Sequence, residues 1–468
     1  MSQYLYGASV QGIQDFIFKT NKLQEIVGAS EIVKGIGSTF SENYNPSEVL
    51  LNAAGNIKAV FTEDACNTVV LEFPKRIMQS AYGVTLSQAV VKIAGESATQ
   101  DEINLLEQRL KVQRNKISIP LDLSLNVMEL NPSTAKPIVA YKTLQKKSTP
   151  VDRATKQKIE ANDTFFANNA HLKEFKNLSE MSNGKNKIAV IHADGNGLGM
   201  LIPKLHKQGK KLSEFSKNLD SATQEAFNRA KNDEMSIRDV ILGGDDMVVI
   251  CNANDALQFT KNFLAYFEEE TEKRMGSKLT ACAGIAYTNE KYPFHYAVSL
   301  AESLCDASKK HAKKINEELA PSCLMFHNIQ SASFENWGKF VEDELTIPTE
   351  SGDVRCDFGP YYLNEEDQPL LGDFINTLEA YRCDGSPISR LRAWLGELYN
   401  SREYADRMLE RINTMANESN NWNACIMEKN LNRFDKELSN EKLIVEKEGV
   451  AKTPIYDVLQ ILSATEVK

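Results

Sequence analysis

Residues 237–251 read IRDVILGGDDMVVIC. Two apolar runs of strand length, Ile237–Leu242 and Met247–Cys251, are joined only by Gly-Gly-Asp-Asp, so the pattern predicts a β-hairpin with these four residues at its turn. Glycine permits positive φ angles and lets the backbone come close to a ligand. The adjacent carboxylates of Asp245 and Asp246 could reach a cation and the phosphate oxygens that it bridges. An ordinary surface turn is the alternative, because glycine and aspartate are common in turns.

A second acidic motif, HADGNGLG at residues 192–199, ends the strand that is expected over Lys187–Ala193. In a sheet of this kind the first and third strands are central neighbours, so Asp194 is expected beside the Asp245 turn. Three carboxylates converging there would repel one another unless a cation bound. The glycines, Gly195 first among them, would let backbone carbonyls and amides contact metal and phosphate.

The elements around these motifs follow the order of a ferredoxin-like α+β unit. After the three strands named above, helices are expected over Asn254–Met275 and Tyr296–Lys314, and strands over Leu279–Thr288 and Cys323–Phe326. Residues 1–95 repeat the order, with strands near 4–10, 48–52, 57–62 and 84–93 and helices near 30–40 and 67–80. Two similar units in one chain suggest an internal duplication, although their sequences are not visibly alike.

Four domains are therefore expected, with boundaries at residues 1–100, 101–184, 185–330 and 331–468. The first and third are the ferredoxin-like units. The second is a linker with a charged amphipathic helix at 101–116, and its polar, lysine-rich part at 130–165 is expected to loop over the surface. The fourth is mostly helical, with helices near 370–381, 389–400, 403–416 and 423–438.

Composition excludes several classes of protein. The net charge is −10, whereas a chain that grips long nucleic acid by itself usually has a basic excess; small phosphorylated substrates held by a metal suit an acidic chain. No run of about 18 apolar residues exists and the N-terminus lacks the pattern of a secretory signal, so neither a membrane span nor export is expected. The eight cysteines form no Cys-x-x-Cys pair, which favours reduced thiols in a cytoplasmic protein over a zinc ribbon or disulfides.

Three further groups of residues have open interpretations. Lys309 and Lys310, near the end of a predicted helix, could hold a β- or γ-phosphate or be a solvated helix end that complements the dipole. Gly28-Ala29-Ser30 could place a helix N-terminus against a phosphate or base, or form a plain N-cap. His192 is expected to be a buried or supporting residue rather than a ligand, and the six histidines do not cluster as a metal nuclease would need.

The chain resembles the large polymerase-like subunit of type III CRISPR effector complexes. The resemblance covers nearly the whole chain and rests on QGIQDFI, IVGAS, AAGN, HADGNGLG, ILGGDDMVVI, AESLCDASK and SPISRLRAWLGELY, in this order. It implies two palm-like domains that face each other, the first non-catalytic and the second catalytic, and a C-terminal helical domain. Members turn ATP into cyclic oligoadenylates or related adenylated signals for antiviral defence when foreign RNA is detected.

The site residues follow from this resemblance position by position. Asp194, Asp245 and Asp246 would be catalytic and would hold Mg²⁺ or Mn²⁺ together with the Gly195 carbonyl. Lys309 matches a triphosphate-binding lysine. Combined with the residues that the sequence itself singles out, the set expected to contact nucleotide is Gly195, Asn196, Gly243, Gly244, Lys309, Gly28 and Ser30.

Three departures from the family pattern stand out. The first palm-like unit begins at residue 4, so the family's frequent N-terminal HD nuclease domain, and with it DNA cleavage, is not expected. The region 129–137 lacks the common cysteine zinc motif. Asn196 replaces the second aspartate of the usual Asp-Gly-Asp string, which would weaken a second metal site.

These observations lead to one main hypothesis and two rivals. The main hypothesis is a nucleotidyltransferase that joins ATP, or another nucleoside triphosphate, by two-metal phosphoryl transfer. The first rival is a nucleotide- or RNA-binding scaffold without turnover, and the second is a GTP-using diguanylate-type cyclase. Against the second rival, the motif ends in Asp246 rather than glutamate. Whether the chain acts alone, as a homodimer or with guide-RNA and target-RNA complex subunits is left open.

Overall fold

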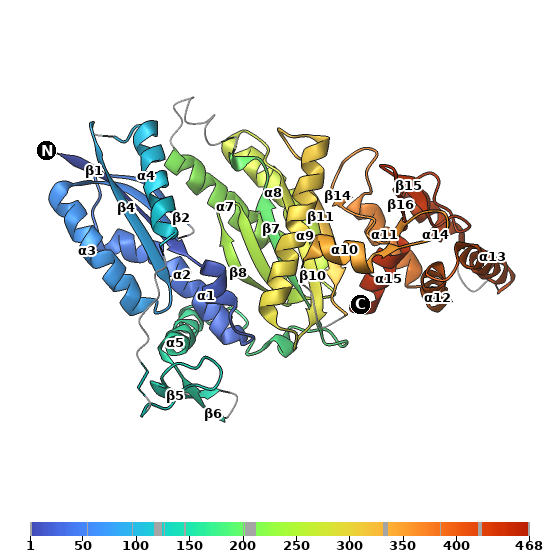
Figure 1. The fold of residues 1–468 in the computed structure, drawn as a ribbon, viewed down its shortest axis with the longest axis horizontal. Helices are drawn as coiled ribbons and strands as arrows, with labels where there is room; N and C mark the ends of the chain where they lie inside the picture. The colour runs from blue at the N-terminus through green and yellow to red at the C-terminus, as the bar shows by residue number, and fades with distance from the viewer. Residues whose placement is uncertain are drawn as a thin grey trace. The chain divides into compact units, whose positions relative to one another are not determined.

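The computed structural model describes residues 2–53, 55–95, 97–116, 124–125, 127–144, 147–199, 201, 212–330, 336–383, 385–419 and 424–466. By the packing of its residues the chain divides into two compact units (Figure 1). Unit 1 comprises Met1–Glu180 and Ile202–Asp220, and unit 2 comprises Met181–Leu201 and Ser221–Lys468. The four domain boundaries stay a prediction.

Unit 1 is built on a four-stranded antiparallel sheet with the order β2-β3-β1-β4. Its elements are β1 (Gln3–Gln11), α1 (Ile13–Phe18), α2 (Leu23–Asn43), β2 (Glu48–Ala53), β3 (Asn56–Thr62), α3 (Glu63–Ser80), β4 (Thr85–Ile93), α4 (Gln100–Arg114), a hairpin of β5 (Ala140–Leu144) and β6 (Lys147–Val151), and α5 (Arg153–Asn168). Successive side chains of a strand point to opposite faces of a sheet. Leu5 packs in one cluster with Leu106 of α4, while Tyr6 stacks on Phe40 of α2, so both faces of this sheet are covered.

Gly28 and Ser30 lie inside a helix, which corrects both interpretations of this segment. Helix α2 begins at Leu23 after the N-cap residue Lys22, and both small residues are buried in its interior. A Cβ atom on Gly28 would lie 1.7 Å from the backbone oxygen of Lys158 in α5. Glycine and serine resemble an N-cap signal in sequence, but here they permit the close crossing of two helices, and they are not at a ligand-binding helix end.

Residues 130–165 do not form the surface loop that their polar composition predicted. They contain the β5–β6 hairpin and most of α5. The carboxylate of Asp152 caps α5 by accepting a hydrogen bond from the backbone N–H of Thr155 at 2.9 Å. The apolar period of this helix is hard to see in the sequence because one buried position is Lys158, whose ammonium donates to the backbone oxygen of Phe16.

Unit 2 contains a six-stranded sheet with the order β14-β11-β10-β7-β9-β8. Its elements are β7 (Lys187–Gly195), α7 (Leu212–Ala230, which begins in unit 1), β8 (Ile237–Gly243), β9 (Asp246–Asn252), α8 (Ala256–Met275), β10 (Ala281–Asn289), α9 (Phe294–Ile315), β11 (Cys323–Asn328) and β14 (Tyr361–Tyr362). Only the β10–β11 pair among these is parallel. The first four strands of both units share the order second, third, first, fourth, as an internal duplication predicts.

Packing explains the small residues of β10, and α7 is a further helix that the sequence did not predict. A Cβ atom on Gly284 would lie 2.0 Å from the backbone oxygen of Ala301, so α9 lies directly on this strand. Helix α7 was not predicted, although Ala222, Ala226 and Ala230 are buried at helical spacing. Their small size gives a weak apolar signal.

The C-terminal part of unit 2 has the four predicted helices and, in addition, two unpredicted helices, α10 and α15, and a small sheet. Its elements are α10 (Trp337–Glu344), β12 (Thr346–Ile347), β13 (Val354–Arg355), α11 (Leu371–Tyr381), α12 (Ile388–Leu398), α13 (Arg402–Ser419), α14 (Ala424–Phe434), β15 (Val445–Lys447), β16 (Val450–Lys452) and α15 (Ile455–Ala464). The strands pair in the order β12-β13-β16-β15, and each has only two or three residues, too few for a period to appear. The α+β class with two ferredoxin-like units is confirmed. None of the helices described is both long and apolar enough to cross a membrane.

Candidate active site

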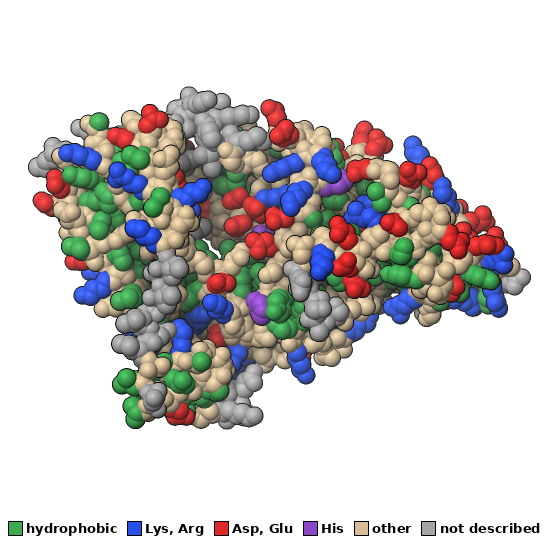
Figure 2. Space-filling model, in the orientation of Figure 1, with side chains coloured by type: hydrophobic (Ala, Val, Ile, Leu, Met, Phe, Trp, Pro, Cys, Tyr) green, Lys and Arg blue, Asp and Glu red, His purple; other side chains and the backbone are tan. Residues whose placement is uncertain are grey.

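The hairpin and the HADGNGLG strand bring their carboxylates to one end of the unit 2 sheet. Strand β9 pairs with both β7 and β8, and Asp246 lies opposite Asp194 on one side and Gly243 on the other. The backbone N–H of Gly195 donates to the backbone oxygen of Asp245 at 3.2 Å. The expectation that Asp194 lies beside the Asp245 turn is therefore confirmed. Figure 2 shows acidic side chains gathered on the surface over these strands, with basic side chains beside them.

Two glycines make this approach possible. Gly244 has a φ of +62°, a left-handed conformation that glycine adopts at little cost. Its backbone oxygen accepts a hydrogen bond of 2.5 Å from the hydroxyl of Thr223 in α7, so this helix holds the turn from outside the hairpin. A Cβ atom on Gly195 would lie 2.8 Å from the Cβ of Asp245. A larger residue at 195 would push the first carboxylate strand away from the turn.

The carboxylates perturb one another strongly. The pKa of Asp245 is raised from 3.8 to about 7, first by burial and then by the negative charges of Asp194 and Asp246. The pKa of Asp246 is also raised, by desolvation and by Asp194, although its side chain is 55% exposed. His192 opposes this shift, with its Nε2 atom 3.9 Å from the Asp246 carboxylate. His192 is itself buried, which fits its expected role as a buried or supporting residue.

Lys309 reaches the same place from α9. Its ammonium donates to the Asp194 carboxylate and, at 2.9 Å, to the backbone oxygen of Gly195. Burial disfavours the ammonium, but Asp194 outweighs burial and raises the pKa of Lys309. With 14% of its side chain exposed, Lys309 is not the solvated helix end that was the alternative, whereas Lys310 is exposed. The sequence match to a triphosphate-binding lysine stays a prediction.

Among the described residues, no three His, Cys, Asp or Glu side chains are arranged to hold a metal ion by themselves. The site nevertheless suits a hard cation. Its donors are carboxylates and the Gly195 carbonyl, the oxygen ligands that Mg²⁺ and Mn²⁺ prefer. The Lys309 ammonium already donates hydrogen bonds to two of these oxygens, one of the Asp194 carboxylate and the Gly195 carbonyl, so the site holds a positive charge. The residues present therefore fit a divalent metal.

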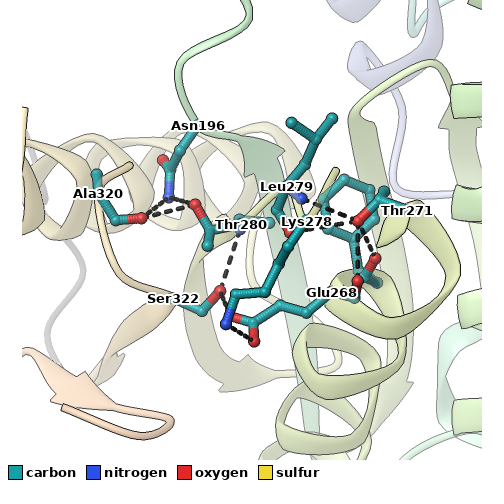
Figure 3. A network of polar contacts seen from close by, with 10 residues as sticks. Asn196, Glu268, Thr271, Lys278, Leu279, Thr280, Ala320 and Ser322 are labelled. Carbon is teal, nitrogen blue, oxygen red and sulfur yellow. Dashed lines mark hydrogen bonds and ion pairs between the residues drawn. The ribbon is translucent and has the colours of Figure 1, made fainter. Parts of the chain in front are cut away.

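The side-chain amide of Asn196 is engaged by hydrogen bonds inside the protein, which corrects its expected role as a nucleotide contact (Figure 3). Its side chain is 3% exposed. Its amide nitrogen donates to the Thr280 hydroxyl at 3.2 Å, to the Ala320 backbone oxygen at 3.1 Å and to the Cys282 sulfur at 3.4 Å. Thr280 and Ala320 lie just before β10 and β11. Asn196 thus ties the end of β7 to the starts of two neighbouring strands.

Sequence reasoning missed two supporting residues, Thr223 and Thr280. Thr223 lies on the unpredicted helix α7, and its position among buried alanines was the only signal for it. The Thr280 hydroxyl donates to Ala320 at 2.6 Å, a contact between residues 40 positions apart that no local pattern reveals.

Comparisons with known proteins identify similar folds and a similar domain. Residues 187–317 match the family model of the Cas10/Cmr2 second palm domain. A chain of the Csm1–Csm4 cassette in complex with pppApApA has a TM-score of 0.53 and 15% identity, over 99% of this chain and 69% of that chain. The cassette in complex with cA4 gives 0.52 and 14%, over 99% and 70%. The Csm1–Csm4 subcomplex in the type III-A CRISPR-Csm interference complex gives 0.50 and 15%, over 99% and 70%.

A search of curated proteins gives no match. At 14–15% identity the structural likeness shows the fold, and it extends over 99% of this chain. The family match is narrower but falls on the domain that carries the three aspartates. Residues 187–317 are therefore similar to the Cas10/Cmr2 second palm domain, and the chain shares its fold with chains of the Csm1–Csm4 structures.

Proposed function

We propose that the second palm domain joins ATP-derived nucleotides through phosphodiester bonds into a cyclic oligoadenylate or a related second messenger of antiviral defence. One observation carries the proposal. The unit 2 sheet brings Asp194 into register with Asp246, beside Asp245. Carboxylates this close repel one another, and a bound cation relieves the repulsion. Cations held by aspartates are a common feature of phosphoryl-transfer sites.

Each residue has a distinct task in this proposal. Asp194, Asp245, Asp246 and the Gly195 carbonyl would hold Mg²⁺ or Mn²⁺, which would acidify the attacking ribose hydroxyl and offset charge on the α-phosphate. As the hydroxyl oxygen bonds to the α-phosphorus and loses its proton to water, the bond between the α- and β-phosphates would break and pyrophosphate would leave. The backbone at Gly243 and Gly244 would pass close to the triphosphate, since neither residue has a side chain to obstruct it.

Lys309 would bind a β- or γ-phosphate as a compact point charge. Its position supports this, because its ammonium lies against Asp194 at the carboxylate cluster. Gly28, Ser30 and Asn196 have no part in the proposal, since each is buried in packing or in a hydrogen-bond network. The partners proposed are ATP and the subunits of a type III CRISPR complex, by likeness to the Csm1–Csm4 structures. A homodimer has no support in these comparisons.

The role of Asn196 favours a second candidate, a nucleotide-binding subunit without turnover. Since its amide is used inside the protein, the site has one carboxylate fewer than the usual Asp-Gly-Asp string would supply. Such a subunit would be stabilised by ATP and Mn²⁺ in thermal unfolding but would leave the ATP unchanged.

Incubation of the purified protein with ATP or GTP and Mn²⁺, followed by mass spectrometry, tests the proposal. Adenylate oligomers formed from ATP are the expected result. A cyclic dinucleotide formed only from GTP would favour the diguanylate-type rival. Thermal stabilisation by ATP with no new product would favour the subunit without turnover, and would contradict the proposed activity if it persists when the partner subunits are added.

A further inference from the structure

The ammonium of Lys309 occupies the atoms at which a metal would bind. It donates to the Asp194 carboxylate and to the Gly195 backbone oxygen, and both are among the proposed metal ligands. A lysine ammonium and a divalent cation cannot share the same lone pairs at full strength, because both are positive and each needs close approach to the oxygen.

The backbone beneath Lys309 is anchored to the sheet by the residues around it. The preceding residue, Ser308, is buried and donates to the backbone oxygen of Ala283 in β10 at 3.1 Å. Helix α9 is also held against β10 at Gly284, where no Cβ would fit. A lysine side chain on such an anchored helix can exchange partners by rotating its four-carbon stem.

We propose that Lys309 is a tethered countercharge that competes with the divalent metal for Asp194 and Gly195 and is released toward the nucleotide phosphates when metal binds. The proposal rests on the proposed function for the identity of the metal ligands. It gives Lys309 two successive partners. Without metal it neutralises Asp194, and with metal and nucleotide it would neutralise a phosphate instead.

If Lys309 competes with the metal, removing its charge should raise the affinity for Mn²⁺, whereas removing a lysine that binds only phosphate should leave that affinity unchanged. Lys309→Met should bind Mn²⁺ more tightly than the unsubstituted protein in the absence of nucleotide, by roughly threefold to tenfold if the lost contacts contribute as much as one ordinary intramolecular hydrogen bond. The same variant should bind ATP more weakly in the presence of Mn²⁺. Free Mn²⁺ is measured by electron paramagnetic resonance, and ATP binding by equilibrium dialysis.

Lys310→Met is the matched control. It removes the same charge from the next position of α9, where the side chain is exposed, and should leave the Mn²⁺ affinity close to that of the unsubstituted protein. Unchanged or weaker Mn²⁺ binding by Lys309→Met would overturn the proposal, as would an equal gain in Lys310→Met or no Mn²⁺ binding by any form. If Lys309→Met does not fold, Lys309→Gln replaces it with the same expected gain.

This test is separate from that of the activity, because Mn²⁺ binding is measured without nucleotide. Absence of any adenylate product would contradict the proposed function and leave the competition standing. Failure of the Mn²⁺ result would remove the competition while product formation remained.

Discussion

At the scale of single residues, Asn196 explains why a position expected to hold a carboxylate does not. Its amide donates to the Ala320 carbonyl and the Thr280 hydroxyl, and an ionised aspartate has no N–H or O–H to offer them. Asn196→Asp should therefore destabilise the protein by about 1–3 kcal/mol and should not add a metal ligand. Urea unfolding and Mn²⁺ titration check both parts. An aspartate variant as stable as the unsubstituted protein that binds additional Mn²⁺ would show that position 196 belongs to the metal site.

Two glycines of the same helix in unit 1 should respond to alanine in opposite directions. A Cβ at Gly28 would collide with the backbone of Lys158, whereas a Cβ at Gly35 would meet nothing within 4 Å. Gly28→Ala should cost at least about 2 kcal/mol, because the two helices must move apart. Gly35→Ala should stabilise α2 by about 0.5–1 kcal/mol. Urea unfolding of both variants measures the difference; equal effects would mean that α2 and α5 do not cross closely.

At the scale of elements, a hydroxyl of helix α7 contacts the Gly-Gly-Asp-Asp turn. Thr223 is fully buried and donates to the Gly244 backbone oxygen at 2.5 Å. Thr223→Val keeps the shape of the side chain and removes the donor, so turnover of ATP should fall by roughly twofold to tenfold while KM changes less. Thr223→Ser retains the hydroxyl and should restore turnover. If valine and serine variants have equal turnover, the hydroxyl has no part in positioning the turn.

Helix α15 introduces a pH dependence at another place in unit 2. The carboxylate of Asp457 accepts hydrogen bonds from the Tyr361 hydroxyl and the Gln460 amide at 2.8 Å each, yet burial raises its pKa from 3.8 to about 7. Between these values the folded state keeps a proton that the unfolded state has lost, so the stability from this group is present at low pH and is lost as pH rises toward 7.

Asp457→Asn should remove this part of the pH dependence. The fall in Tm between about pH 5 and about pH 8 should be smaller in the variant than in the unsubstituted protein, because the amide does not titrate in this window. Thermal unfolding followed by circular dichroism at both pH values measures it. The same slope in both proteins would mean that Asp457 titrates near its ordinary pKa when folded.

At the scale of the whole molecule, the sequence predicts what is local and periodic. The long strands of both sheets and helices such as α3, α4 and α9 follow from runs of apolar residues and their spacing. The meeting of Asp194 with the hairpin follows from the strand order alone. The hydrogen bonds of Asn196 could not be predicted, because its partners Thr280 and Ala320 are distant in sequence and depend on the completed sheet.

The remaining misses have the same physical origin. In sequence Gly28 resembles the start of a helix, and only the packing of α5 against α2 shows why glycine is needed there. In α5 the charged residue Lys158 occupies a buried position, so the sequence does not show which face of this helix points inward. The strands of the C-terminal sheet are too short to show a period. Each of these features is decided by tertiary contacts that outweigh local preference.

If the carboxylates at the end of the unit 2 sheet perform phosphoryl transfer, as we propose, the combined substitution Asp245→Ala and Asp246→Ala should abolish it. The control is Asp233→Ala combined with Glu234→Ala, which removes two exposed carboxylates before β8. We predict that the first double variant folds, as judged by circular dichroism, and yields no oligomeric product from ATP and Mn²⁺ in mass spectrometry, while the control retains the product of the unsubstituted protein. Undiminished product from the Asp245→Ala, Asp246→Ala protein would contradict the account.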